Sequence, residues 1–110
     1  MIRGILVEPH KAPRIIEFKE GYKELQRLVE GRFEMPALFN DVDIVINEDG
    51  KFNGSELNKL LYYNGKLVDM IFGNILIVDA NDEGETISLS PEKIEKYLRI
   101  FNGDSLWLGW

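Results

Sequence analysis

The sequence predicts a single α+β domain, built on an antiparallel or mixed sheet of five or more strands that carries two main helices on one face. Its 110 residues are the length of one domain. Short apolar, β-branched runs alternate with turn residues, and two longer stretches show the spacing of an amphipathic helix. Apolar residues make up 45% of the chain and charged residues 29%, so an ordinary core can form across residues 1–110 without disulfides or metals.

The first half of the chain predicts four strands and one helix. We expect the strands at residues 2–7, 14–19, 32–39 and 42–47, and the helix at 22–30. The proline-rich loop after the first strand predicts a hairpin, and Gly31 is a typical residue to follow a helix. Pro36 places the third strand at an edge or bends it.

The second half predicts a short helix, two strands and a final helix. The leucines at 57, 60 and 61 share one helical face, with Ser55 as the N-cap, so residues 55–63 are expected to form a short helix. Strands are expected at 67–72 and 74–79, hinged at Gly73, and Ser90-Pro91 opens the last helix over 90–101. The expected core contains Ile5, Leu25, Leu28, Ile44, Ile46, Ile75, Ile77, Ile94 and Leu98.

Charge and composition limit the partners and the compartment. With 13 basic and 19 acidic residues, the net charge is −6, which argues against direct binding to nucleic acid. The absence of cysteine excludes disulfides and thiol chemistry and fits a reducing cytosol. No apolar run approaches the ~18 residues of a membrane span, and no signal sequence is evident, so we expect a cytoplasmic protein that does not associate with a membrane.

The sequence offers no catalytic constellation. His10 is the only histidine and lies in a proline-flanked loop, without the context of a general base or a metal site. Acidic pairs such as Asp41 and Asp43 are typical of loops in acidic proteins, and the glycine–lysine steps match no phosphate-binding motif. We therefore predict no catalytic residue, no metal site and no cofactor, and a binding protein is favoured over an enzyme.

The segment 47–73 supplies the candidate binding site. Its many asparagines and glycines predict a folded segment that is rich in turns. The amides and lysines of this segment are candidates to bind a phosphate, and the aromatic rings are candidates to stack on a base. The candidate ligand-binding residues are Asn47, Lys51, Asn53, Asn58, Tyr62, Asp69 and Trp107, with Lys59, Lys66 and Tyr63 as further contributors. For Asn58 and Asp69 the other interpretation is a hydrogen bond that pins a loop, because an unpaired buried polar group costs about 1–3 kcal/mol.

The C-terminal tail, residues 102–110, places Trp107 and Trp110 among the last six residues, where chains usually fray. One interpretation is a final strand whose Trp107 closes the core. The other is an interface, either a self-association surface or an aromatic platform for a ligand. Because two solvated tryptophans would expose a large apolar surface, we expect a homodimer with the tail at or near the shared surface.

The order of several short motifs resembles a known family. These are Glu8-Pro9, Gly31 with Glu34, Asn47-Glu48 with Gly50-Lys51, Asn58 with Leu61, Asp69 with Gly73, and Ser88-Leu89. Over residues 1–101 the chain resembles the family called domain of unknown function 3846, found in bacteriophages, conjugative elements and their host bacteria. The resemblance brings no established activity. It implies a small phage or mobile-element accessory protein in the host cytoplasm, a group enriched in inhibitors of host defence.

Three functions remain open from the sequence. The first is sequestration of a small nucleotide-type ligand, which would antagonise host defence. The second is inhibition of a host defence or DNA-binding protein by contact, with the acidic chain acting as a DNA mimic. The third is a small nucleotide hydrolase. The first is preferred narrowly over the second.

Overall fold

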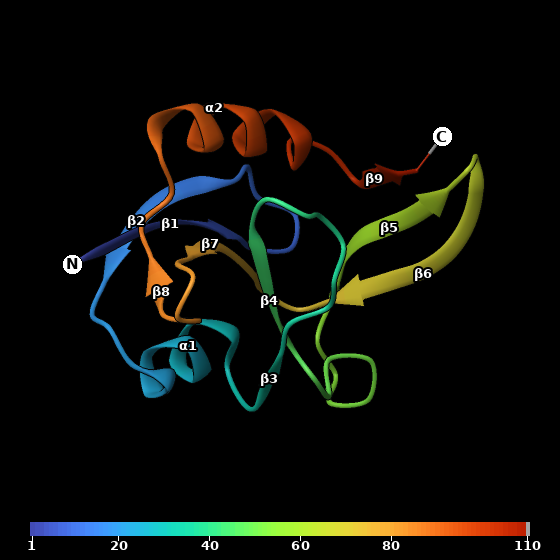
Figure 1. The fold of residues 1–110 in the computed structure, drawn as a ribbon. Coiled ribbons are helices and arrows are strands. Elements are labelled where there is room, and N and C mark those ends of the chain that lie inside the picture. Colours follow the sequence, from blue (N-terminus) through green and yellow to red (C-terminus); the bar gives the residue numbers. More distant parts are fainter. Residues whose placement is uncertain (110) are drawn as a thin grey trace.

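The computed structural model describes residues 1–109, which form one α+β domain of two sheets and two helices (Figure 1). The elements are β1 (Ile2–Val7), β2 (Arg14–Phe18), α1 (Tyr22–Val29), β3 (Phe33–Glu34), β4 (Asp43–Asn47), β5 (Leu57–Tyr63), β6 (Lys66–Phe72), β7 (Ile75–Ala80), β8 (Thr86–Ile87), α2 (Pro91–Ile100) and β9 (Ser105–Leu108). The predicted α+β fold class is confirmed. In residues 1–109 no helix is long and apolar enough to cross a membrane.

The larger sheet has the strand order β2-β1-β7-β4-β3, with β8 added to β7, and all of its pairings are antiparallel. Its central strand, β7, contains the run Ile75–Val78, in which every side chain is buried. Gly4 lies beside this strand, where a Cβ would come within 2.7 Å of the carbonyl oxygen of Ile77. The absence of a side chain at residue 4 therefore lets this part of the sheet pack closely.

The two helices cover opposite faces of the larger sheet, so the expectation that both lie on one face is wrong (Figure 1). The helix α2 packs on the face that presents Ile44 and Ile77, and α1 packs on the face that presents Val45 and Leu76. The reason is the apolar character of the central strands on both faces, which requires a cover on each side. Leu89, just before α2, also belongs to the α2 cluster.

The expected core residues all lie in or against these two clusters. Those that are buried are Ile5, Leu25, Leu28, Ile44, Ile75 and Ile77, and those that are partly buried are Ile46, Ile94 and Leu98. Strand β4 buries side chains on both faces, since Ile44 is 1% exposed and its neighbour Val45 is 0% exposed.

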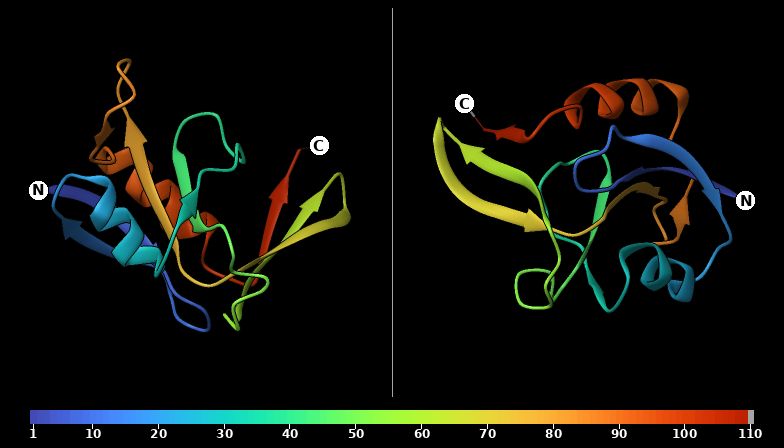
Figure 2. Two further views of the ribbon diagram at one scale, coloured as in Figure 1. Left: turned by 90° about the horizontal axis from the view of Figure 1, so that it is seen from below. Right: turned by 180° about the vertical axis from the view of Figure 1, so that it is seen from behind.

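The smaller sheet, which we call the C-terminal sheet, consists of β5, β6 and β9 in the order β6-β5-β9. Its strand β5 occupies the segment expected to be a short helix, and that prediction is wrong. Pairing with β6 on one side and with β9 on the other overrides the helical spacing of the leucines. The strand expected at 32–39 is also shorter, since only Phe33–Glu34 pairs with β4. In both panels of Figure 2 the C-terminal sheet lies to one side of the larger sheet.

Candidate functional site

Asn47 is buried and has a structural role at the end of α1. Its Nδ2 donates to the carbonyl oxygens of Val29 at 3.1 Å and of Glu30 at 3.2 Å, while its Oδ1 accepts from the amide of Asp49 at 2.8 Å. The last carbonyls of a helix lack partners within the helix, and this amide supplies one. A Cβ on Gly31 would lie 2.8 Å from the same Nδ2, so a glycine at residue 31 leaves room for the contact.

Asn58 is also buried, and its Nδ2 ties two segments of main chain together. It donates to the carbonyl oxygen of Val7 at 2.9 Å and to that of Gly73 at 2.7 Å. Its Oδ1 has no hydrogen-bond partner within residues 1–109. The side chain therefore joins the end of β1 to the hinge between β6 and β7, as the loop-pinning interpretation requires.

Lys51, in the turns between β4 and β5, forms an ion pair with Asp69 of β6, and both side chains are about half exposed. The hydrogen bond from Lys51 holds the pKa of the Asp69 carboxyl below its usual value. Asn53 lies in an exposed turn, where its Oδ1 accepts from the amide of Ser55 at 3.0 Å. Lys59, expected near a phosphate, is instead buried and donates to the carbonyl oxygen of Gly103, and burial lowers its pKa.

The expected ligand-binding residues therefore lie in separate places. Asn47 and Lys51 line one hollow of about 200 Å³, which Glu34 and Glu48 also line. Two carboxylates beside a single lysine, itself paired with Asp69, are a poor environment for a phosphate. Asn58 is buried against main chain elsewhere, and the polar part of the predicted site does not converge on one pocket.

The aromatic part of the predicted site is assembled on the C-terminal sheet. Tyr62 of β5 and Trp107 of β9 stack with ring centroids 4.3 Å apart and an interplanar angle of 20°. Trp107 is 61% exposed. The other exposed large apolar side chains of this sheet are Leu57, Tyr63, Leu67, Val68 and Met70. Such a concentration on one small sheet is typical of a protein-binding surface.

A groove runs along the outer side of β9. It has a volume of about 460 Å³, and its walls are Leu38, Phe39 and Ile100 on one side and the β9 segment on the other. Lys96 lies at its border. The walls are mostly apolar side chains, and the volume falls in the range of about 300–1,000 Å³ that ligand sites occupy. The tryptophan and leucines of β9 are recognisable in the sequence as an apolar segment, whereas no sequence pattern indicated the opposite wall.

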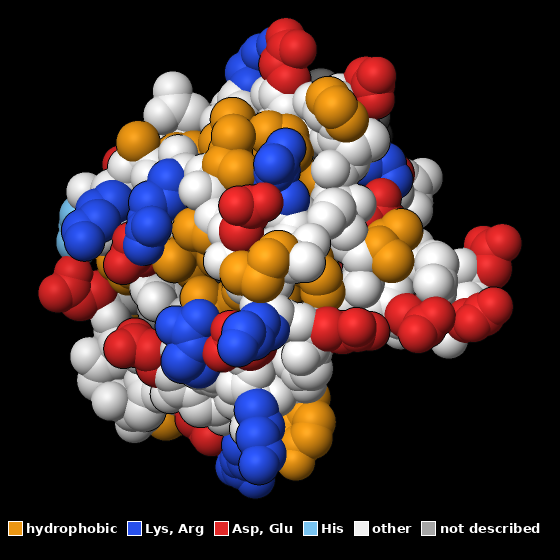
Figure 3. Space-filling model, turned by 90° about the vertical axis from the view of Figure 1, so that its left-hand side faces the viewer, with side chains coloured by type: hydrophobic (Ala, Val, Ile, Leu, Met, Phe, Trp, Pro, Cys, Tyr) orange, Lys and Arg blue, Asp and Glu red, His pale blue; other side chains and the backbone are white. Residues whose placement is uncertain are grey.

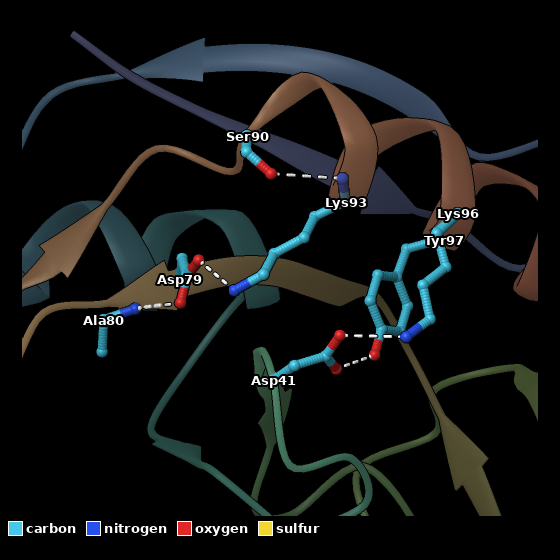
Figure 4. Close-up of polar contacts among 7 residues, drawn as sticks. All are labelled: Asp41, Asp79, Ala80, Ser90, Lys93, Lys96 and Tyr97. Atoms are coloured by element: carbon cyan, nitrogen blue, oxygen red, sulfur yellow. Dashed lines mark hydrogen bonds and ion pairs between the residues drawn. The ribbon is translucent and has the colours of Figure 1, made fainter.

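Contacts between α2 and the loop before β4 fix the wall opposite β9 (Figure 4). The Tyr97 hydroxyl donates to Oδ1 of Asp41, and Lys96 Nζ contacts the other carboxylate oxygen at 3.0 Å. The hydrogen bond from Tyr97 lowers the pKa of Asp41, and burial together with this carboxylate raises the pKa of Tyr97. Phe39 packs edge-on against the Tyr97 ring, with the two ring centroids 5.2 Å apart, so Tyr97 positions Phe39 in the groove wall.

A second ion pair holds the other end of α2 to the larger sheet. Lys93 Nζ lies 2.7 Å from the carboxylate of Asp79, and Ser90 caps the helix by accepting from the amide of Lys93 at 3.3 Å (Figure 4). These charges are therefore used within the fold. Residues 1–109 contain no group of three or more side chains placed to ligate a metal ion.

The fold and this surface define a small α+β protein with an exposed apolar sheet beside a groove. The chain belongs to the family described as Domain of unknown function (DUF3846), whose model matches residues 2–102. The groove wall at residues 38, 39 and 100 lies inside the matched region, and β9 lies beyond it. Searches of curated proteins and of solved structures gave no match to the chain.

Proposed function

We propose that this protein is a non-enzymatic binding protein that acts by contact with another protein through the C-terminal sheet. The observation that carries the proposal is the density of exposed apolar side chains on β5, β6 and β9. Within residues 1–109, these three strands contain half of the large hydrophobic side chains that are exposed. Leu67 and Met70 of β6 lie beside the Tyr62–Trp107 stack, since they pair with Tyr62 and Leu60. Together they offer the apolar centre that protein interfaces use.

Small-ligand sequestration is less well supported by the same geometry. The side-chain amides of Asn47 and Asn58 donate to main-chain carbonyl oxygens, and Lys51 is paired with Asp69. A nucleotide would need several free cationic or amide groups around one cavity. The hollow of about 200 Å³ beside Lys51 is instead lined by two glutamates, whose charges would repel a phosphate.

The acidic surface expected of a DNA mimic also has limited support. Figure 3 shows a face on which Lys and Arg side chains lie among Asp and Glu side chains, with acidic groups alone on one protruding part. Neighbouring charges of both signs weaken a long-range negative field. An apolar contact, which salt does not screen, fits the exposed side chains better. The phage or mobile-element setting and the antagonism of host defence remain part of the proposal and rest on the family resemblance.

Site-specific photo-crosslinking tests the proposal. A photoreactive amino acid at Leu67, which is 52% exposed on β6, should form a discrete adduct with a protein of the bacterium that carries the gene. The control is Phe52, which is 88% exposed in a turn outside the C-terminal sheet and should give no such adduct. The Met70→Asp change should abolish the adduct at Leu67 by placing a charge in the apolar contact.

Two results would count against protein binding. One is equal labelling from Leu67 and Phe52, which would mean that the sheet has no specific partner. The other is a melting-temperature increase with one member of a panel of mono- and cyclic nucleotides that Met70→Asp leaves unchanged, which would restore small-ligand sequestration.

A further inference from the structure

The outer edge of β9 leaves main-chain hydrogen-bonding groups without a partner. Strand β9 is parallel to β5 and ends the sheet. The Leu60 amide donates to the carbonyl oxygen of Asp104 at 2.7 Å, and the Asn64 amide donates to that of Leu108 at 3.3 Å. Because these groups alternate in direction along a strand, the N–H and C=O groups of Ser105 and Trp107 point away from β5. Within residues 1–109 no strand pairs with that side of β9.

The other outer strands carry features that prevent further pairing, whereas β9 does not. Strand β2 has Arg14 and Glu17, and β6 has Lys66, Asp69 and a register shift. Strands β3 and β8 have two residues each. Charges, bulges and shortness are the usual protection of a sheet edge. The segment Ser105–Leu108 has no charge, no proline and no bulge.

We propose that a second copy of this chain covers this edge, with its own β9 antiparallel to the first. Two identical edges in antiparallel contact are related by a two-fold axis, so each copy satisfies the outward groups of Ser105 and Trp107 of the other. The two C-terminal sheets then join into one continuous sheet. The exposed Trp107 of each copy approaches the dyad on the same face, beside its own Tyr62.

The groove beside β9 offers apolar surface that a second copy would cover when its β9 pairs with this edge. Its walls, Leu38, Phe39 and Ile100, lie along the edge and are only partly covered within one copy. A two-fold contact brings the walls of both copies to the same interface, where apolar surface meets apolar surface. An added strand needs main-chain donors and acceptors, which an apolar small molecule does not have.

This inference does not depend on the proposed function. Strand β6, which carries Leu67 and Met70, is the opposite edge of the C-terminal sheet and stays free in the dimer. A failure of dimerisation would leave the crosslinking test from Leu67 intact, and a failure of that test would leave the dimer intact.

Sedimentation velocity across the micromolar range tests the dimer. The wild-type chain should sediment as a dimer, and Ser105→Pro should shift it to monomer, because proline removes an N–H that points away from β5 and spares the β5–β9 ladder. Circular dichroism should show the same secondary structure in both. The matched control is Leu67→Asp on the opposite edge, which should remain dimeric. A wild-type monomer at every concentration, or a folded Ser105→Pro variant that remains dimeric, would overturn the proposal.

A second measurement covers the case in which Ser105→Pro does not fold. The chain contains no cysteine, so Ser105→Cys introduces a single site for a nitroxide label. Because Ser105 lies near the two-fold axis, the electron paramagnetic resonance spectrum should show strong dipolar broadening. That broadening should disappear when labelled protein is diluted with excess unlabelled protein. A label on Leu67→Cys should show no broadening, and equal spectra from the two positions would refute pairing through β9.

Discussion

Replacing Tyr97 by phenylalanine tests the contact that holds the groove wall. The ring of Tyr97 has 0% exposure and keeps its packing against Phe39 and Phe101 in the variant, so the change removes only the hydroxyl. That hydroxyl donates to the carboxylate of Asp41, and a hydrogen bond to a charged group contributes about 1.5–3 kcal/mol. Because Asp41 retains Lys96 at 3.0 Å, we expect the lower part of this range.

The expected loss of about 1.5–2 kcal/mol corresponds to a decrease in melting temperature of about 6–9 °C, since unfolding entropy is about 2.1 cal/mol/K per residue. Differential scanning calorimetry at neutral pH measures it. Tyr22→Phe is the matched control, because its exposed hydroxyl can bond to water equally well in both states. That variant should stay within about 0.5 kcal/mol of wild type.

The same pair predicts a pH dependence with two signs. The pKa of Asp41 is lower in the folded state, so its contribution to stability is present above its ordinary value of 3.8 and is lost as the pH falls through the folded value. The pKa of Tyr97 is raised, so stability falls as the pH rises past the ordinary value of 10.0 for tyrosine. Tyr97→Phe should weaken the acid dependence and remove the tyrosine contribution to the alkaline one. Unchanged stability at neutral pH together with unchanged pH profiles would refute the role given to this hydroxyl.

Three further changes test other parts of the structure. Asn58→Ala should lower the free energy of unfolding by about 1–3 kcal/mol in a urea titration, because two buried carbonyls lose their donor, and wild-type stability would show that water replaces the amide. Gly4→Ala should lower the melting temperature, because a Cβ would lie 2.7 Å from the Ile77 carbonyl oxygen. An unchanged melting temperature would show that β7 can shift away from the added methyl group without loss of stability. Lys51→Ala should raise the pKa of Asp69 toward its ordinary range in an NMR titration. The free energy of unfolding should fall by less than about 1 kcal/mol, because the ion pair is exposed. An unchanged pKa would show that the two side chains do not pair in solution.

Local signals in the sequence were sufficient where one segment carries its own pattern. The final helix has a serine cap, a proline in its first turn and a glutamate near its start, and it forms at Pro91–Ile100 close to the expected range. Strand β4 lies within the expected 42–47. The aromatic tail was also recognisable, since Trp107 is a largely exposed residue of β9 in the C-terminal sheet, whereas Trp110 lies outside the described residues.

The side of the sheet on which each helix lies was decided by the tertiary structure, although a signal was present. The run Ile75–Val78 is apolar without alternation, which is the pattern of a strand buried on both faces. Two helices on one face would have left Leu76 and Val78 uncovered. Both residues instead pack with α1, opposite to α2.

The segment 57–63 and the groove depended wholly on long-range contacts. Leucines at 57, 60 and 61 fit a helix and a strand almost equally, and the pairing with β6 and β9 selects the strand. The sequence indicates that Asn47 and Asn58 are important but not whether they face a ligand or a carbonyl, because their carbonyl partners come from α1 and from β1, far away in the chain. The sequence by itself determined both long helices, most of the strands and the apolar character of the tail. Only the tertiary structure placed that tail beside residues 38, 39 and 100, since a groove is made by segments far apart in the chain.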